Sequence, residues 1–171
     1  MHSTEITAET TRAMVAALAL PGQAAPALDL LGRLYRDHVG YGMMTIILFN
    51  RAAGYGRRVW SSRHDTHPPG ANKAILQSDW IDLVLERGQV FVADTVAEFR
   101  PHYGDWELLQ SMGLLSGANF PVIVNGVTIG SVNLTAAGEG YYTAEKVALA
   151  GALAGAATLA LLMQFQLDTA G

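Results

Sequence analysis

The stretch Phe120-Pro-Val-Ile-Val-Asn-Gly-Val-Thr-Ile-Gly-Ser-Val-Asn-Leu134 decides the fold of this 171-residue chain. Two runs rich in β-branched residues are separated by the dipeptide Asn125-Gly126. Asn-Gly between apolar runs is a strong signal for a two-residue hairpin turn, because both turn positions need a positive φ. The stretch therefore predicts an antiparallel pair of strands at the centre of the fold.

The turn also predicts which residues of the two strands face each other. Counting outward from Asn-Gly puts Val124 opposite Val127 and Val122 opposite Ile129, and these four side chains then share one face. The alternate residues of both strands are also largely apolar. We therefore expect a central hairpin that is covered on both faces.

The sequence on either side predicts a chain that mixes helices and strands. Periodic apolar residues, with stops at Gly and Pro, predict helices at 4–19, 25–38, 80–87, 106–112 and 143–165, and strands at 43–50, 57–62 and 90–93. Residues 71–77 are expected to form a short turn or strand, and residues 95–104 a loop. Asp105 is the expected N-cap of the helix that follows it.

Composition and charge exclude several classes of protein. The formal net charge is −4 and there is no run of basic residues, so no nucleic-acid partner is expected. The chain has no cysteine, which excludes disulfides, thiolate metal sites and a cysteine nucleophile. The first residues do not have the pattern of a secretory signal, so we expect a cytoplasmic protein. The uncharged run 147–163 is interpreted as a buried helix and not as a membrane span.

Four motifs resemble the C-terminal part of a GAF domain. They are the pair Met112-Gly113 at the end of a helix, the strand Pro-Val-Ile-Val at 121–124, Ile-Gly-Ser-Val-Asn-Leu at 129–134, and the helix start Tyr-Thr-Ala-Glu at 142–145. The resemblance covers roughly residues 28–165. It implies an α+β fold with a central antiparallel sheet of five or six strands. The terminal helices would pack on one face, and a ligand pocket would lie on the other.

The resemblance also implies how the chain is organised. Residues 1–171 would form a single domain with its core at about 28–165 and an N-terminal helical extension at 1–27. Domains of this family commonly pair through their terminal helices, which predicts a homodimer. The small residues Gly151, Ala154, Gly155 and Ala157 would let these helices approach closely.

The family has several known ligand classes, and this chain lacks the motifs of three of them. Without cysteine it cannot be a free methionine sulfoxide reductase or carry a cysteine-linked bilin. The cyclic-nucleotide signature begins at Asn72-Lys73 and is then broken by Ala74. No cofactor or metal is therefore predicted. Haem ligation through a histidine stays open as an alternative that no motif supports.

The predicted partner is a small molecule, held between the sheet and segments 60–112. Aromatic residues in this part of the chain could stack on a planar ligand, and polar residues on otherwise apolar strands need hydrogen-bond partners. The predicted ligand-binding residues are Trp60, Arg63, Trp80, Asp94, Tyr103, Met112, Asn119 and Asn133. The first hypothesis is therefore a small-molecule sensor or regulatory module.

Two other hypotheses stay open. An enzyme could perform cofactor-free acid/base chemistry with His102, Asp105 and His64, because a histidine beside carboxylates titrates near neutral pH. A histidine pair, His64 and His67, could also ligate a metal, although a solvated loop explains it more simply. The third hypothesis is a structural dimerisation module, whose mark would be a pocket filled by its own side chains.

Overall fold

Residues 3–22 and 24–169 are described by a computed structural model, and they fall into two compact units. A helical unit combines the residues up to Gly40 with those from Ala144 onward. A sheet unit comprises Tyr41–Thr143. Each unit is described by itself, and the boundaries of a single domain over 1–171 stay a prediction.

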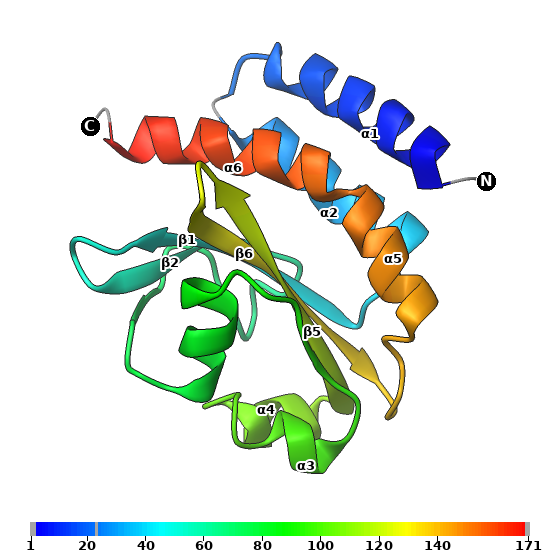
Figure 1. Cartoon of the computed structure of the whole chain (residues 1–171), viewed down its shortest axis with the longest axis vertical. Helices are drawn as coiled ribbons and strands as arrows, with labels where there is room; N and C mark the ends of the chain where they lie inside the picture. Colours follow the sequence, from blue (N-terminus) through cyan, green and yellow to red (C-terminus); the bar gives the residue numbers. More distant parts are fainter. Residues whose placement is uncertain (1–2, 23, 170–171) are drawn as a thin grey trace. The chain divides into compact units, whose positions relative to one another are not determined.

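The sheet unit contains six antiparallel strands, as the sequence predicted (Figure 1). The strands are β1 Met43–Asn50, β2 Tyr55–Ser61, β3 Asn72–Ala74, β4 Phe91–Ala93, β5 Leu114–Val124 and β6 Val127–Ala137. Their order across the sheet is β3-β2-β1-β6-β5-β4. The long β5–β6 hairpin is therefore central, and the predicted α+β class is confirmed.

The turn of this hairpin has the predicted geometry. Asn125 and Gly126 have φ values of 51° and 75°, and Asn125 is the one non-glycine residue with a positive φ in the described part of the chain. Asn tolerates this left-handed conformation better than most residues, which explains its place at the first turn position. Val124 pairs with Val127, as expected.

The register differs from the prediction beyond the second pair, Ile123 with Thr128. Val122 pairs with Gly130 and not with Ile129, because a β-bulge interrupts the ladder between Val122 and Ile123. A bulge places one extra residue on one strand and reverses the faces that follow. Both faces of this hairpin are apolar, so the sequence pattern could not reveal the change.

One face of the sheet carries a line of polar side chains at its centre. Thr45 of β1 pairs with Asn133 of β6, and Asn133 pairs with Asn119 of β5, so the three lie on the same face. We call it the lid face, because the parts of residues 62–113 outside strands β3 and β4, which we call the lid, pack on it. The lid contacts the face through two apolar clusters, one around Phe99 and Leu109 and one around Ile81 and Leu85.

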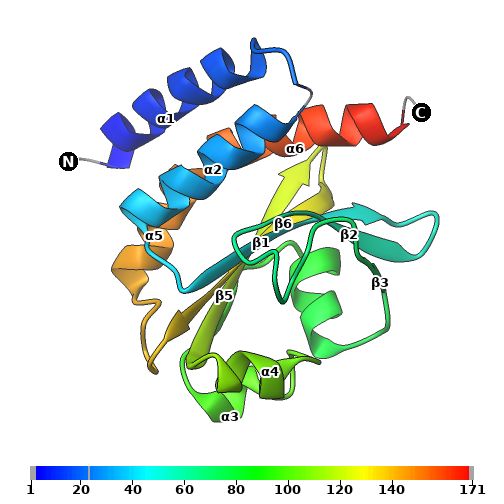
Figure 2. The ribbon, with the colours of Figure 1, turned by 180° about the vertical axis from the view of Figure 1, so that it is seen from behind.

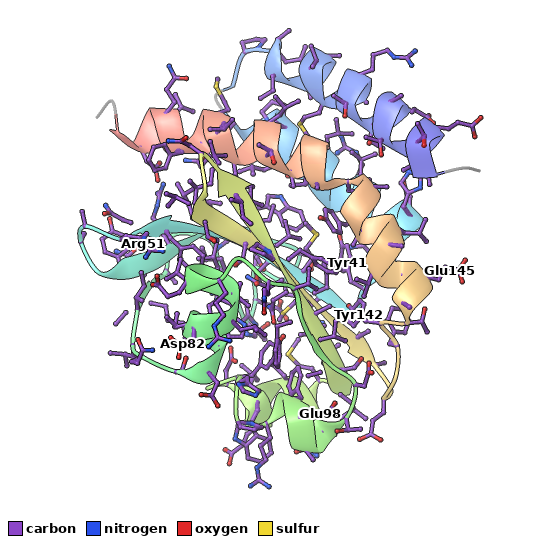
Figure 3. All side chains as sticks on the ribbon, viewed as in Figure 1. Tyr41, Arg51, Asp82, Glu98, Tyr142 and Glu145 are labelled. Atoms are coloured by element: carbon purple, nitrogen blue, oxygen red, sulfur yellow. The ribbon has the colours of Figure 1, made fainter. Side chains whose placement is uncertain are left out.

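Three short helices form the lid. They are η1 Ile81–Glu86, α3 Val96–Phe99 and α4 Trp106–Ser111; Figure 2 shows α3 and α4 beside the end of β5, and Figure 3 labels Asp82 on η1 and Glu98 on α3. The segment η1 has the wider π-helical hydrogen bonding. An ion pair of 2.6 Å between Glu86 and Arg51 ties it to the β1–β2 turn.

Two expectations for the lid were wrong. Residues 95–104 are not all loop, because α3 begins with a capping box between Thr95 and Glu98. The side chain of Asp105 precedes α4 but makes no capping hydrogen bond. Its carboxylate contacts a histidine instead, as described below.

The helical unit consists of four helices that pack on one another. They are α1 Ser3–Leu18, α2 Ala25–His38, α5 Ala144–Ala152 and α6 Ala154–Thr169. The first two match the predicted helices closely. The predicted continuous helix at 143–165 was wrong, because the chain bends by 52° between α5 and α6. The hydroxyl of Thr7 donates to the Ala152 carbonyl at the break (3.1 Å) and so satisfies a group that a continuous helix would have bonded internally.

The bend also bears on the apolar C-terminal run. Over residues 3–22 and 24–169, no single helix has both the length and the apolar character of a membrane span. Helices α5 and α6 have that length and apolar character only when they are counted together across their bend. Gly155 lies against α1, since a Cβ on it would come within 3.2 Å of the Thr11 hydroxyl. One of the predicted small residues thus serves helix packing within the chain.

Candidate functional site

The centre of the lid face is a buried pair of asparagines. Asn119 and Asn133 are only 1% and 8% exposed, and the Asn119 Nδ2 donates to the Asn133 Oδ1 at 2.7 Å. The Asn133 amide lies 3.5 Å from the Thr45 hydroxyl, on the next strand. Strands β1, β6 and β5 therefore place a row of polar groups across the middle of the sheet.

Two aromatic residues of the lid complete this row. The Trp80 Nε1–H and the Tyr103 hydroxyl both donate to the Asn119 Oδ1, at 3.1 and 2.7 Å. An indole N–H can only donate, so this contact fixes which end of the Asn119 amide is oxygen. Both lone pairs of that oxygen are thus used. We call Thr45, Trp80, Tyr103, Asn119 and Asn133 the polar cluster.

Trp80 is positioned by the start of η1. The Ser78 hydroxyl accepts a hydrogen bond from the Ile81 backbone N–H (3.3 Å) and so binds the first residue of η1. The Trp80 indole meets the Phe49 ring edge-on, with 6.3 Å between ring centroids. Apolar packing on one side and a hydrogen bond on the other hold the indole against the sheet.

Tyr103 is positioned by the loop between α3 and α4. Its ring stacks on Phe99, with 4.0 Å between centroids and 11° between planes. Burial raises the pKa of the Tyr103 hydroxyl far above its ordinary value, and the hydrogen bond to Asn119 offsets part of this shift. The group is therefore a neutral donor over the whole physiological range of pH.

Gly117 of β5 makes room for the Tyr103 hydroxyl. A Cβ at this position would lie 2.5 Å from the Tyr103 oxygen and 3.1 Å from the Phe99 ring. We expect Gly117→Ala to displace Tyr103, break its bond to Asn119 and lower the free energy of unfolding by about 1–3 kcal/mol. Urea denaturation checks this. Gly104→Ala, at a position with open space around it, is the matched control, and equal effects of the two substitutions would contradict the packing described here.

A second polar group lies in the lid, around a buried histidine. The His67 Nε2 contacts the Asp105 carboxylate at 3.0 Å, and its Nδ1 lies 2.9 Å from the Thr66 hydroxyl. A carboxylate only accepts, so Nε2 carries the proton. The positive charge of Arg58 also acts on Asp105. Burial lowers the pKa of Arg58, and the charge of Asp105 offsets part of that shift.

The three predicted catalytic residues lie in different surroundings. Asp105 pairs with His67, whereas the His102 ring packs edge-on against Phe91, with 4.7 Å between centroids. His64 is exposed in the turn after β2. Within residues 3–22 and 24–169, no three His, Asp or Glu side chains gather closely enough to hold a metal ion.

The predicted ligand-binding residues divide into two groups. Trp80, Tyr103, Asn119 and Asn133 come together in the polar cluster, and Met112 packs in the neighbouring apolar cluster around Phe99. The others lie elsewhere. The strand register places Trp60 opposite Ile46 and hence on the other face of the sheet. Arg63 pairs with Asp65 at the surface, and Asp94 is exposed.

Sequence reasoning missed two contributors to this region. Thr45 lies inside a run that was interpreted only as an apolar buried strand. The Thr-x-x-Glu capping box at Thr95–Glu98 was a recognisable helix-start signal that would have corrected the loop expected at 95–104. The pairing of His67 with Asp105 spans 38 residues and carries no local signal.

The space directly in front of Asn119 is taken by Trp80 and Tyr103. A shallow, open surface depression of about 680 Å³ lies elsewhere, in the helical unit along α1. Its lining residues are Thr4, Thr7, Ala8, Thr11, Arg12 and Val15. The polar cluster is therefore a closed arrangement in which the chain's own groups satisfy one another.

Comparison with known proteins supports the fold. The GAF domain of a phosphoenolpyruvate-protein phosphotransferase from Acinetobacter has a TM-score of 0.72 at 12% identity, covering 95% of this chain and 97% of that one. A phycocyanobilin-bound GAF domain from a cyanobacterial phytochrome has a TM-score of 0.69 at 15% identity, covering 98% and 97%. The GAF domain of a two-component sensor histidine kinase from Bacillus halodurans has a TM-score of 0.68 at 10% identity, covering 84% and 95%.

No protein with curated function matches this chain. The similarity to solved structures, at these identities, shows the fold alone. A sequence model of the GAF domain matches residues 27–162, which is most of the chain. The chain belongs to the GAF domain family.

Proposed function

We propose that this chain is a small-molecule-binding sensor domain whose ligand site is the polar cluster on the lid face. One observation carries the proposal: five polar side chains from five different segments converge at the centre of the sheet, around a buried asparagine pair. The groups can donate and accept hydrogen bonds but carry no formal charge. Such a set is suited to recognising a small polar ligand.

The energetics of burial support this interpretation. Replacing both partners of a buried hydrogen bond with apolar groups is often nearly neutral, so stability alone does not require amides here. A connected network is costly when any member loses its partner. The presence of these buried polar side chains is explained more directly by a ligand that forms hydrogen bonds with them than by packing.

The solved relatives support a sensor role without identifying the ligand. Phycocyanobilin-bound and phycoerythrobilin-bound GAF domains are known from a cyanobacterial phytochrome, and another relative belongs to a sensor histidine kinase. This chain has no cysteine with which to link a bilin covalently. The proposed ligand is therefore held non-covalently.

A thermal-shift screen of a metabolite library tests the proposal. We expect at least one compound to raise the melting temperature of the wild type. Asn133→Ala should lower the affinity for that compound about tenfold or more, because the substitution removes a polar partner from the cluster. Asn72→Ala, at an exposed asparagine on β3, is the matched control and should bind as the wild type does. Compounds that stabilise all three proteins equally would contradict the proposed site.

We also propose that the domain acts as a cytoplasmic homodimer joined through its helical unit. Large apolar side chains are exposed on these helices: Val15 of α1 at 56%, and Leu162 and Phe165 of α6 at 38% each. Exposed apolar surface of this kind is typical of interaction sites. Light scattering should give twice the 18.2 kDa chain mass, and a monomer mass would contradict the dimer.

A further inference from the structure

Trp80 occupies the position against Asn119 that a ligand would take. Its Nε1–H donates to the Asn119 Oδ1 at 3.1 Å, and its ring meets the edge of Phe49. The rest of the indole packs with Ile47, Ile81 and other members of the apolar cluster under η1. A flat ring with one N–H donor is therefore already bound to the asparagine pair.

A second buried polar atom lies on the same face of the sheet. Ser131 is fully buried, and its hydroxyl has no hydrogen-bond partner among the described residues. Ser131 pairs with Ile47 and lies two residues from Asn133, with a regular ladder between them, so it shares the lid face. Ile47 belongs to the same apolar cluster as Trp80. The hydroxyl is thus an unused hydrogen-bonding group whose cross-strand neighbour, Ile47, belongs to the cluster that contains Trp80.

The residues before Trp80 are weakly attached to the sheet, whereas η1 after it is anchored by the buried Ile81, Val84 and Leu85. Residues 71–79 before it are almost all exposed, and Leu76 is 73% exposed. The short strand β3 pairs over only three residues, and the ion pair between Arg51 and Glu86 lies at the surface. Segment η1 is a π-helix, a geometry found frequently at functional sites. Low local burial of this kind is typical of segments that open.

We propose that Trp80 is a built-in plug of the ligand site, and that the ligand is a neutral, flat heterocycle with a ring N–H that takes its place. The inference rests on the proposed function. When the indole leaves, the Asn119 Oδ1 keeps its bond from Tyr103 and has one lone pair free for the ligand N–H. A ring nitrogen or carbonyl on the same ligand accepts from the Ser131 hydroxyl.

The chemistry of the surroundings favours a neutral ligand. The indole N–H shares the Asn119 amide with the Tyr103 hydroxyl and the Asn133 amide, and none of these groups carries a formal charge. Burying an uncompensated charge among neutral groups is costly. A flat heterocycle with one donor and one acceptor matches both the shape and the polarity that Trp80 leaves behind.

Binding of indole and 1-methylindole by calorimetry tests the proposal. We expect Trp80→Ala to bind indole at least about tenfold more tightly than the wild type, because the plug is gone. 1-Methylindole lacks the N–H and should bind this variant about tenfold more weakly than indole. Trp106→Ala removes a different lid indole, one that packs under Arg100, and should bind indole as weakly as the wild type.

Three results would overturn the proposal. They are equal affinity of the wild type and Trp80→Ala for indole, equal affinity of Trp80→Ala for the two probes, and no binding of indole by folded Trp80→Ala. If that variant does not fold, Trp80→Phe replaces it. This variant keeps a ring but loses the bond to Asn119, and it should bind indole about fivefold more tightly than the wild type, as expected for one hydrogen bond. Equal affinity there would overturn the proposal as well.

Failure of the plug can be distinguished from failure of the proposed function. In one outcome, a library compound binds the wild type and loses affinity in Asn133→Ala while Trp80→Ala shows no preference for indole over 1-methylindole. This result would support the proposed ligand site and reject the proposal that Trp80 plugs it. If the library gives no compound whose binding depends on Asn133, the proposed function is rejected, and the plug proposal that rests on it is rejected too.

Discussion

Replacing Asn119 with leucine should lower the free energy of unfolding by about 3–5 kcal/mol, because it strands three buried polar groups at once. The Trp80 N–H, the Tyr103 hydroxyl and the Asn133 carbonyl each lose their partner. Leucine has the same branching as asparagine but is larger, so the substitution leaves no cavity, and the lost hydrogen bonds act together with overpacking. Urea denaturation measures it.

A double substitution separates the network from packing. Asn119→Leu combined with Asn133→Leu should cost at least about 1 kcal/mol less than the sum of the single changes, since both partners of the Asn119–Asn133 hydrogen bond are then removed together and neither amide is left stranded. The exposed Asn72→Leu is the control and should change stability by no more than about 0.5 kcal/mol. Additive effects of the two buried changes would show that the asparagines do not act as a pair.

The second large effect is an alkaline loss of stability caused by three buried tyrosines. Burial raises the pKa of Tyr35, Tyr103 and Tyr142 above the ordinary value of a phenol. Their stabilising contribution is complete below the pKa of the unfolded chain, about 10, and is lost as the pH rises toward the folded value. Each tyrosine adds a slope of about 1.4 kcal/mol per pH unit, so the three together give about 4 kcal/mol per unit above pH 10.

Tyrosine-to-phenylalanine variants check this assignment. Tyr142→Phe is the cleanest variant, because the buried Tyr142 hydroxyl has no partner among the described residues. It should reduce the slope of unfolding free energy against pH by about a third and leave stability at pH 7 unchanged or higher. Tyr141→Phe serves as the control. An unchanged slope in Tyr142→Phe would contradict the buried, neutral state of this phenol.

The sequence predicted the frame of the fold because its signals are local. The Asn-Gly turn, the helix at 25–38 and the strand at 43–50 each follow from propensity and period over a few residues, and the structure has them. The bulge after Val122 and the bend between α5 and α6 were not predicted, because an apolar run looks the same on either side of such an irregularity.

The candidate site was predicted in part, for a similar reason. Asn119 and Asn133 stood out as polar residues on apolar strands, and Trp80 and Tyr103 as aromatic residues in the lid. The other three residues meet at the Asn119 amide. This arrangement depends on contacts between residues up to 39 positions apart, which no local pattern encodes. Trp60 was expected beside them but faces the other way, because the strand alternation at β2 was not fixed by the sequence.

The central claim, that the polar cluster binds a small molecule, is tested most directly by native mass spectrometry. The wild type, Asn133→Ala and Asn72→Ala are each incubated with the same metabolite extract and compared. The account predicts a non-covalent adduct of defined mass on the wild type and on Asn72→Ala that is lost from Asn133→Ala. An adduct held equally by all three, or none on any of them, would contradict the claim; the second result would favour a structural module whose core is closed by Trp80 and Tyr103.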